Sequence, residues 1–232
     1  MNRQWLVLLL FVVLLLLTHN QARAEEVEIT AEPSHHLVLE NDQVRVFSVT
    51  VAPGKATLMH RHRHDYVYVA IGDARISNEI EGREPVEAML SDGEVRFTKG
   101  NFAHIVRDLS ATPFRNVTIE LLQDEKRRAE KSTWDKDSGE DSYPGADRKI
   151  VSVKDGVRIS QIEIDPKAFL PKGRHNGPIL LIAVSAIELS ARSDGKEPVG
   201  KLLKPGDVWW LDATPSLNNA GTGPAELVML EF

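Results

Sequence analysis

The stretch His60-Arg61-His62-Arg63-His64-Asp65 runs directly into an apolar segment that alternates from residue 66 to residue 71. In an extended strand, side chains two residues apart point to the same face, so His60 and His62 would lie side by side. His104, from a distant segment, supplies a third imidazole. Imidazoles brought together in this way on a β-scaffold are typical of a metal site. The alternative is an exposed basic turn, because two arginines alternate with the histidines.

The chain also resembles itself when it is shifted so that Val44-Arg45 falls on Val157-Arg158. The same shift, called the repeat step below, places Glu84-Pro85-Val86 on Glu197-Pro198-Val199. It holds without insertion or deletion from Val44 to Gly93. The repeat predicts a tandem duplication with one small domain in each half.

Alternating apolar segments recur in both halves, and short turn sequences separate them. The alternating segments are residues 43–51, 66–71, 94–98, 116–122, 158–164, 179–189 and 226–232. Turn sequences such as Pro53-Gly54 and Pro205-Gly206 lie between them. Many short strands at regular spacing favour a sandwich or a barrel, so the fold class is predicted as all-β.

Residues 1–24 have the pattern of a secretory signal peptide. A positively charged start precedes an unbroken apolar run at residues 5–17, and Ala22-Arg23-Ala24 matches a small-x-small cleavage site. The run would span about 20 Å as a helix, less than a hydrocarbon core of about 30 Å. We therefore expect a secreted or periplasmic protein whose leader is removed, after which the mature chain has no membrane partner. The alternative is an uncleaved anchor. The chain has no cysteine, so packing alone must hold the fold in an oxidising compartment.

Charge is mixed along the chain. Without the leader, 26 basic and 34 acidic residues give a net charge of −8. No clustered basic face follows from this pattern, and nucleic acid is not expected as a partner. Residues 124–149 are rich in charged residues and serine, which predicts a solvated connector with a short polar helix at 124–131 and a loop at 138–146. The alternative is that part of the connector covers a pocket.

The spacing around the histidines resembles the first motif of the cupin family. That motif runs Gly, five residues, His-x-His, three or four residues, Glu, six residues, Gly. Here five residues separate Gly54 from His60, and six residues separate Asp65 from Gly72. Aspartate thus takes the place of the family's glutamate, and only two residues separate it from His62.

The second cupin motif runs Gly, five residues, Pro-x-Gly, two residues, His, three residues, Asn. Gly93 and His104 match it at the required spacing. The departures are Lys99, Asn101 and Asp108, in place of Pro, Gly and Asn. With the repeat, the chain resembles a bicupin, which implies two tandem jelly-roll barrels (double-stranded β-helices). Residues 25–123 would form the first barrel and residues 150–232 the second.

The resemblance implies one divalent transition metal in the first barrel, held by His60, His62 and His104 with Asp65 as a weaker fourth ligand. His64 competes with Asp65 for the fourth place, and the turn position expected for His64 favours Asp65. The candidate ions are iron, manganese, nickel, copper and zinc.

The second half lacks most of these ligands at the repeat step, so we expect it to be metal-free. The equivalents of His60, His62, Asp65 and His104 are Gly173, His175, Pro178 and Leu217. Trp209 and Trp210 indicate a filled apolar interior, with one tryptophan pointing inward and the other packing between the lobes. The alternative is a metal-free ligand pocket lined by tryptophan.

Side-chain alternation also predicts what lines the first barrel. Because Asp65 is expected to point inward, Val67 and Val69 should lie inside the barrel and Tyr66 and Tyr68 on its outer side. The expected pocket residues beside the metal are Arg96 or Phe97.

The resemblance implies an exported, mononuclear metal-dependent oxygenase, similar to quercetinase-like dioxygenases, that acts on a small organic molecule. Three neutral imidazoles leave metal positions open for substrate or dioxygen. No second carboxylate or lysine stands ready as a general base, which disfavours an isomerase. The alternative is a non-catalytic exported cupin that binds a small ligand or a metal. The sequence assigns no catalytic residue and leaves a homodimer open.

Overall fold

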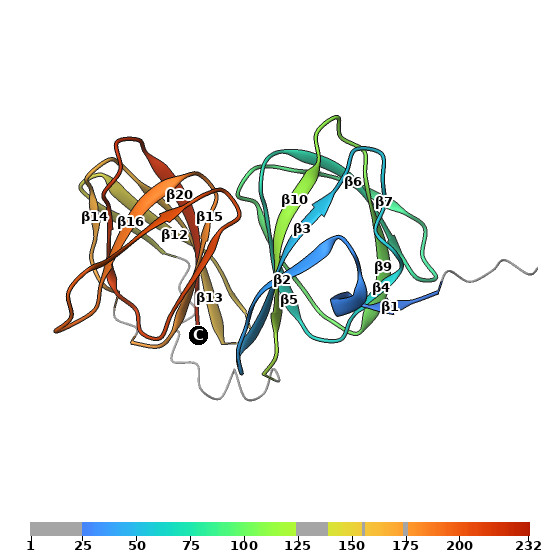
Figure 1. Ribbon diagram of the computed structural model, residues 1–232, viewed down its shortest axis with the longest axis horizontal. Coiled ribbons are helices and arrows are strands. Elements are labelled where there is room, and N and C mark those ends of the chain that lie inside the picture. Colours follow the sequence, from blue (N-terminus) through green and yellow to red (C-terminus); the bar gives the residue numbers. More distant parts are fainter. Residues whose placement is uncertain (1–24, 124–138, 155, 174–175) are drawn as a thin grey trace, which may run out of the picture.

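The computed structural model describes residues 25–123, 139–154, 156–173 and 176–232. They form four β-sheets and one short 3-10 helix, η1 (Ile29–Ala31). Two sheets from the first half make one barrel-like lobe, and two sheets from the second half make another beside it (Figure 1). The predicted all-β fold of jelly-roll barrels is confirmed. Within the described residues, no helix is long and apolar enough to cross a membrane.

The first lobe consists of sheets A and B. Sheet A has the order β1 (Val27–Glu28), β4 (His60–His62), β9 (Phe102–Asp108), β6 (Ala74–Ile80) and β7 (Val86–Leu90). Sheet B has the order β2 (His35–Glu40), β3 (Val44–Val51), β10 (Phe114–Leu121), β5 (Tyr66–Ala70) and β8 (Val95–Thr98). Strands far apart in sequence are therefore neighbours, which brings the two histidine segments together.

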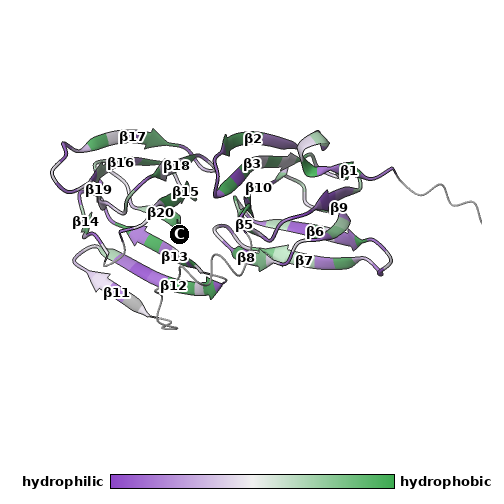
Figure 2. Cartoon of the chain, turned by 90° about the horizontal axis from the view of Figure 1, so that it is seen from below, coloured by the Kyte–Doolittle hydropathy of each residue, from purple (hydrophilic) through white to green (hydrophobic). Residues whose placement is uncertain are grey.

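The second lobe consists of sheets C and D. Sheet C has the order β11 (Glu140–Tyr143), β12 (Ala146–Lys154), β13 (Val157–Ile164), β20 (Ala225–Glu231), β15 (Ile179–Ala183) and β18 (Val208–Leu211). Sheet D has the order β14 (Phe169–Leu170), β19 (Ser216–Asn219), β16 (Ile187–Arg192) and β17 (Val199–Leu203). Figure 2 shows the two lobes side by side from below.

Strand bounds in the second lobe follow those of the first at the repeat step for most of its length. The step carries the start of β3, Val44, onto the start of β13, Val157, and the start of β8 onto the start of β18. From Phe114, the start of β10, it would reach Leu227, but β20 already starts at Ala225. The second lobe is thus slightly shorter before its last strand.

The predicted connector at 124–149 ends too late. Its first part, including the helix expected at 124–131, lies outside the described residues. The loop predicted at 138–146 is wrong for residues 140–143, which form β11. They pair with the start of β12 in an antiparallel hairpin, with Glu140 opposite Lys149. β12 in turn pairs with β13, so these residues belong to sheet C of the second lobe.

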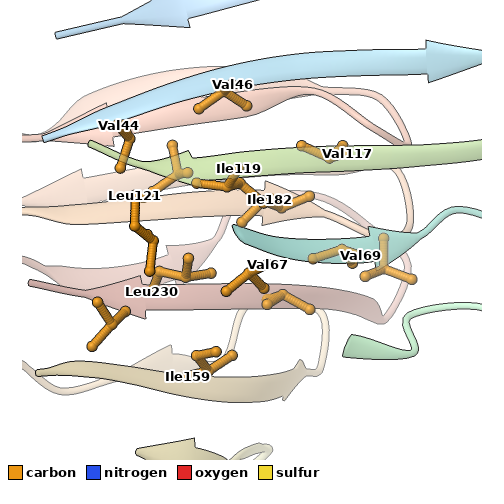
Figure 3. Packing of buried hydrophobic residues seen from close by; sticks show 14 of the residues in the cluster. Val44, Val46, Val67, Val69, Val117, Ile119, Leu121, Ile159, Ile182 and Leu230 are labelled. Atoms are coloured by element: carbon orange, nitrogen blue, oxygen red, sulfur yellow. The ribbon is translucent and has the colours of Figure 1, made fainter. Parts of the chain in front are cut away.

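Sheets B and C face each other, and a large apolar cluster lies between them (Figure 3). The first lobe contributes Val44, Val46, Val67, Val69, Ile71, Val117, Ile119 and Leu121. The second lobe contributes Val157, Ile159, Leu180, Ile182, Val184, Val228 and Leu230. Two hydrogen bonds cross at its edge, from Gln161 Nε2 to Gly93 O (3.0 Å) and from Arg115 Nη2 to Pro205 O (2.8 Å).

The predicted facing of β5 is therefore wrong. Val67 and Val69 pack between the lobes, and Tyr66 and Tyr68 line the barrel interior. Alternation shows which residues share a face but not which face is inside. The error came from the assumption that Asp65 points inward, because its carboxylate contacts Gly100 and Lys99 and does not line the cavity.

Candidate metal centre

Four imidazoles gather inside the first lobe. His60 and His62 lie on β4 and are 0 % and 2 % exposed. His104 lies on β9 directly opposite His60 in the antiparallel register. His35, at the start of β2, packs against His60 with the ring centres 4.7 Å apart. The structure thus brings together the three predicted histidines and adds one that the sequence did not single out.

The nitrogen atoms of these rings are close enough to share one ion. One ring nitrogen each from His35, His60 and His62 lie within 4.8 Å of one another. His104 Nε2 lies 3.1 Å from His60 Nε2. Two nitrogen ligands about 2.0–2.1 Å from one ion lie about 3 Å apart when they bind at neighbouring positions. The spacing of the two Nε2 atoms therefore suits a shared metal ion.

The Nδ1 atoms of three rings are held from outside. Each faces an oxygen acceptor and donates to it, namely His35 to Glu32 Oε2 (2.6 Å), His60 to Leu58 O (3.0 Å) and His104 to Asn78 Oδ1 (2.8 Å). A neutral imidazole has only one N–H, so each Nε2 then carries a lone pair. The lone pairs of His60 and His104 face each other, and a cation shared by the two rings would satisfy both. The residues present fit a metal ion.

Burial keeps His60, His62 and His104 in the neutral form that binds metals. Burial lowers the pKa of His60 to about 4, and the neighbouring His35 adds to the effect. Burial also holds the pKa values of His62 and His104 well below the usual value, and the neighbouring imidazoles lower them further. At neutral pH these three rings therefore need no deprotonation before an ion binds.

Glu32 anchors His35 from outside the cluster. Its carboxylate is 2 % exposed and accepts hydrogen bonds from the N–H groups of Leu58 (3.1 Å) and Ser34 (2.8 Å) as well as from His35. Burial raises the pKa of Glu32, but these hydrogen bonds outweigh it and the pKa lies below its usual value. A carboxylate that fixes a ring nitrogen in this way orients a metal-binding histidine and makes it more basic.

Glu120 on β10 lies behind His62. Its Oε1 is 3.9 Å from His62 Nδ1, and neither buried atom has a hydrogen-bond partner. Burial raises the pKa of Glu120 to about 7, although Arg45 Nη1 lies 3.3 Å from Oε2 and lowers it in part. A small shift of the ring or the carboxylate would join the two groups. Sequence reasoning missed Glu120 because nothing in the local pattern distinguishes it from the other polar residues of β10.

Asp65 does not join the imidazoles, which corrects its assignment as a fourth ligand. Its Oδ1 accepts a hydrogen bond from Gly100 N (2.9 Å), and Lys99 Nζ lies 3.2 Å from its Oδ2. Gly100 packs so closely here that a Cβ at this position would lie 2.3 Å from His64 O. Asp65 and His64 therefore belong to a turn that is held against the next turn, and neither side chain lines the cavity.

A cavity of about 440 Å³ opens beside the histidines. Its walls are His35, Val49, Val51, Thr57, His60, His62, Tyr66, Tyr68, Ile76, Asn78, Ile80, Arg83, Arg96, Thr98, Lys99, Phe102, His104, Val106, Phe114, Asn116 and Thr118. Tyr66 stacks on His62 with the ring centres 4.0 Å apart, and burial raises its pKa. Of the two predicted pocket residues, Arg96 lines the cavity, and Phe97 packs against the cluster between the lobes.

The second lobe has an apolar interior at the corresponding place. Leu217 is 2 % exposed within the cluster that fills this lobe, and Trp209 packs against the same cluster. Trp210 packs instead against the cluster between the lobes, as predicted for one of the two tryptophans. His175 lies outside the described residues. Within the part of the chain that the structure describes, the group that can hold a metal is in the first lobe.

Comparison with solved structures identifies the fold. A structure of Bacillus subtilis oxalate decarboxylase at pH 4.6 matches with a TM-score of 0.57 at 12% identity, over 82% of this chain and 68% of that chain. AerE from Microcystis aeruginosa matches with a TM-score of 0.56 at 10% identity, over 86% of this chain and 97% of that chain. The chain has a cupin fold. At these identities the likeness shows the fold alone.

A further oxalate decarboxylase structure, from a study of its Mn(II) centres, matches with a TM-score of 0.59 at 11% identity, over 85% of this chain and 74% of that chain. That neighbouring protein has Mn(II) centres. No family model matches the sequence, and no curated protein matches it.

Proposed function

We propose that this cupin holds one divalent transition metal in its first lobe, bound by His60 together with His35, His62 and His104. The observation that carries the proposal is the contact between His60 Nε2 and His104 Nε2, because hydrogen bonds on both Nδ1 atoms direct two lone pairs at each other. The depressed pKa values of the buried rings make a shared proton a poor substitute for a metal cation.

His35 takes the place that the cupin motif gives to a carboxylate. Asp65 is engaged by Gly100 and Lys99, whereas His35 lies among the other rings and is fixed by Glu32. A site built from neutral imidazoles carries less negative charge than one with a carboxylate. It should therefore prefer the ions that favour nitrogen ligands, such as zinc, copper, nickel or iron.

The activity we propose is that of a metal-dependent oxygenase on a small organic molecule. A bound redox metal would supply dioxygen activation, or Lewis-acid chemistry on a substrate oxygen. The protein contributes a partly apolar cavity that positions the substrate beside the rings. The second candidate is a non-catalytic protein that binds a metal or a small ligand. The position of Tyr66 favours this candidate, because its ring stacks on His62 and covers part of the cluster.

We further propose that the protein is an exported bicupin. The pattern of residues 1–24 supports export, and the strand bounds that recur at the repeat step support tandem duplication of one barrel. Amino-terminal sequencing of the protein from a periplasmic fraction should begin at Glu25. A chain that still begins at Met1 would contradict cleavage.

Elemental analysis of the purified protein tests the metal, and an oxygen electrode tests the activity. We expect about one equivalent of metal per chain. Oxygen uptake with a flavonol such as quercetin should depend on that metal and stop when a chelator removes it. Metal binding without uptake would favour the non-catalytic candidate. A purified chain that binds none of the candidate ions would overturn the proposal.

A further inference from the structure

We propose that the first-lobe cavity binds a small organic anion with an apolar body, and that Arg96 holds its carboxylate. The inference rests on the proposed function only in using the cavity beside the metal-binding histidines. It adds the chemical class of the ligand and the side chain that recognises it.

Charge is distributed very unevenly around this cavity. The whole chain carries a net charge of −6. Yet Arg83, Arg96 and Lys99 all line the cavity, and no acidic residue does so among the residues that the structure describes. The three cations come from the β6–β7 hairpin, from β8 and from the β8–β9 turn. Asp65 and Glu94 pair with Lys99 and Arg96 but do not themselves line the cavity. The charged side chains in the lining are therefore all cations, which favours an anionic ligand.

Arg96 is the cation best placed to bind a carboxylate. It lies on β8 opposite Tyr68, whose side chain also lines the cavity. Its Nε donates to Glu94 Oε1 at 2.6 Å, which fixes the plane of the guanidinium group. The guanidinium group also hydrogen-bonds the Tyr68 side chain. Because it has five N–H donors, donors remain on its terminal nitrogens to hold a carboxylate by two hydrogen bonds. Arginine forms such paired contacts better than lysine does.

The rest of the wall suits an apolar body. Val49, Val51 and Phe114 from sheet B face Ile76 and Val106 from sheet A across the cavity. The volume of about 440 Å³ lies in the range of pockets that enclose small molecules. The ligand we infer therefore has one anionic end near Arg96 and an apolar portion between the two sheets.

Comparison with the second lobe indicates that Arg96 is not required by the fold. The repeat step carries Arg96 onto Trp209, which lies on the equivalent strand β18 and packs against the apolar cluster of that lobe. The same backbone position thus accepts an apolar side chain where the interior is filled. An arginine at this position in the first lobe needs another explanation, and ligand binding supplies it.

A matched pair of probes tests the charge of the ligand. 3-Phenylpropanoate and 3-phenylpropanamide have nearly the same shape, and only the first is an anion at pH 7. Titration calorimetry should be done on the full chain, first without metal and then loaded with Zn(II). We expect the acid to bind at least about tenfold more tightly than the amide in both states, because a charged carboxylate forms stronger hydrogen bonds with a guanidinium group than a neutral amide does.

Arg96→Gln should remove this preference. Arg75→Gln is the control, because Arg75 is similarly exposed and bound to a glutamate, Glu87, but does not line the cavity. Arg75→Gln should keep the preference, and circular dichroism should show both variants folded. Equal binding of the two probes, no binding of the acid, or an acid preference that survives Arg96→Gln would each overturn the inference.

The same samples separate this inference from the proposed metal centre. If the chain binds no metal but still prefers the acid through Arg96, the anion pocket stands and the metal proposal fails. If Zn(II) binds but the acid is not preferred, the metal proposal stands and the anion pocket is wrong.

Discussion

The two lobes have equivalent strands, but the first encloses a cavity with polar side chains and the second is filled with apolar side chains. At the repeat step, Arg96 and His104 of the first lobe become Trp209 and Leu217 of the second. The first pair lines a cavity, and the second pair packs with the apolar cluster that fills its lobe. Since both interiors occur on one strand arrangement, the arrangement does not depend on what the barrel encloses. The chemistry of a lobe is therefore set by a few inward side chains.

An arginine–glutamate pair shows how a small change exposes a functional group. In the second lobe, Arg158 donates from Nε and Nη2 to both oxygens of Glu231, at 2.6 and 2.8 Å. In the first lobe the equivalent Arg45 instead donates from Nε and Nη2 to Glu40, with the shorter contact at 2.6 Å, and reaches Glu120 only at 3.3 Å. The Oε1 atom of Glu120 is left beside His62. The same pair is structural in one lobe and available to the histidines in the other.

The largest effect should come from His60→Ala. His60 contacts both His35 and His104, so its loss removes the ring that links these two and should abolish metal binding. Titration calorimetry with Zn(II) measures this. His36→Ala is the control, because His36 neighbours His35 but is exposed, and it should bind metal normally. A full equivalent of tightly bound metal in His60→Ala would place the site elsewhere, with the second lobe as the first region to examine.

The next largest effect should separate His35 from Asp65. We expect His35→Ala to weaken Zn(II) binding by more than about 100-fold, since loss of outer partners alone costs about 10–100-fold. Asp65→Ala should leave the affinity within about threefold and lower the melting temperature, because its turn loses the hydrogen bond to Gly100. The reverse ranking in calorimetry would restore Asp65 as the ligand.

A smaller effect should distinguish the two buried glutamates. Glu120→Gln should weaken metal binding by about 10–100-fold, because the carboxylate would no longer orient His62. Glu231→Gln should leave metal affinity unchanged and lower the melting temperature, because Arg158 loses a paired carboxylate. Calorimetry and thermal unfolding of both variants test the comparison. Equal metal affinities in the two variants would show that Glu120 is structural too.

The smallest effect should be that of mild acid. An ion competes with protons only below the pKa of its ligands, and the pKa of His60 is lowered to about 4. Zn(II) affinity should therefore change by less than about threefold between pH 7 and pH 5.5 and should fall as the pH drops through about 4. An ordinary imidazole would lose its metal near pH 6.5. A fall centred there would mean that the rings are more hydrated than the structure shows.

Parts of this site could be predicted from the sequence because they are local. The spacings from His60 to His62 and from Gly93 to His104 lie within short segments, so a motif records them. His35 lies on a strand that has no fixed spacing to β4, and only the fold brings it to His60. The signal for His35 that the sequence did offer is the acidic residue Glu32, three residues before it.

The facing of β5 could not be predicted for a related reason. Both faces of this strand are largely buried, one in the barrel and one between the lobes, so hydrophobicity does not distinguish them. Tyr66 and Tyr68 face the barrel interior because the valines on the other face of β5 belong to an apolar surface. The second lobe covers that surface. A sequence pattern carries no record of that second covering layer.

The shared apolar cluster limits how this protein could be reduced to a smaller module. A first lobe cut out alone would expose the side chains that sheet B now packs against sheet C, from Val44 to Leu121. Each buried valine, leucine or isoleucine contributes about 1.5–3 kcal/mol, and a whole domain is stable by only about 5–15 kcal/mol. A free-standing metal-binding lobe would therefore need polar replacements along β3, β5 and β10 before it could be engineered as an independent unit.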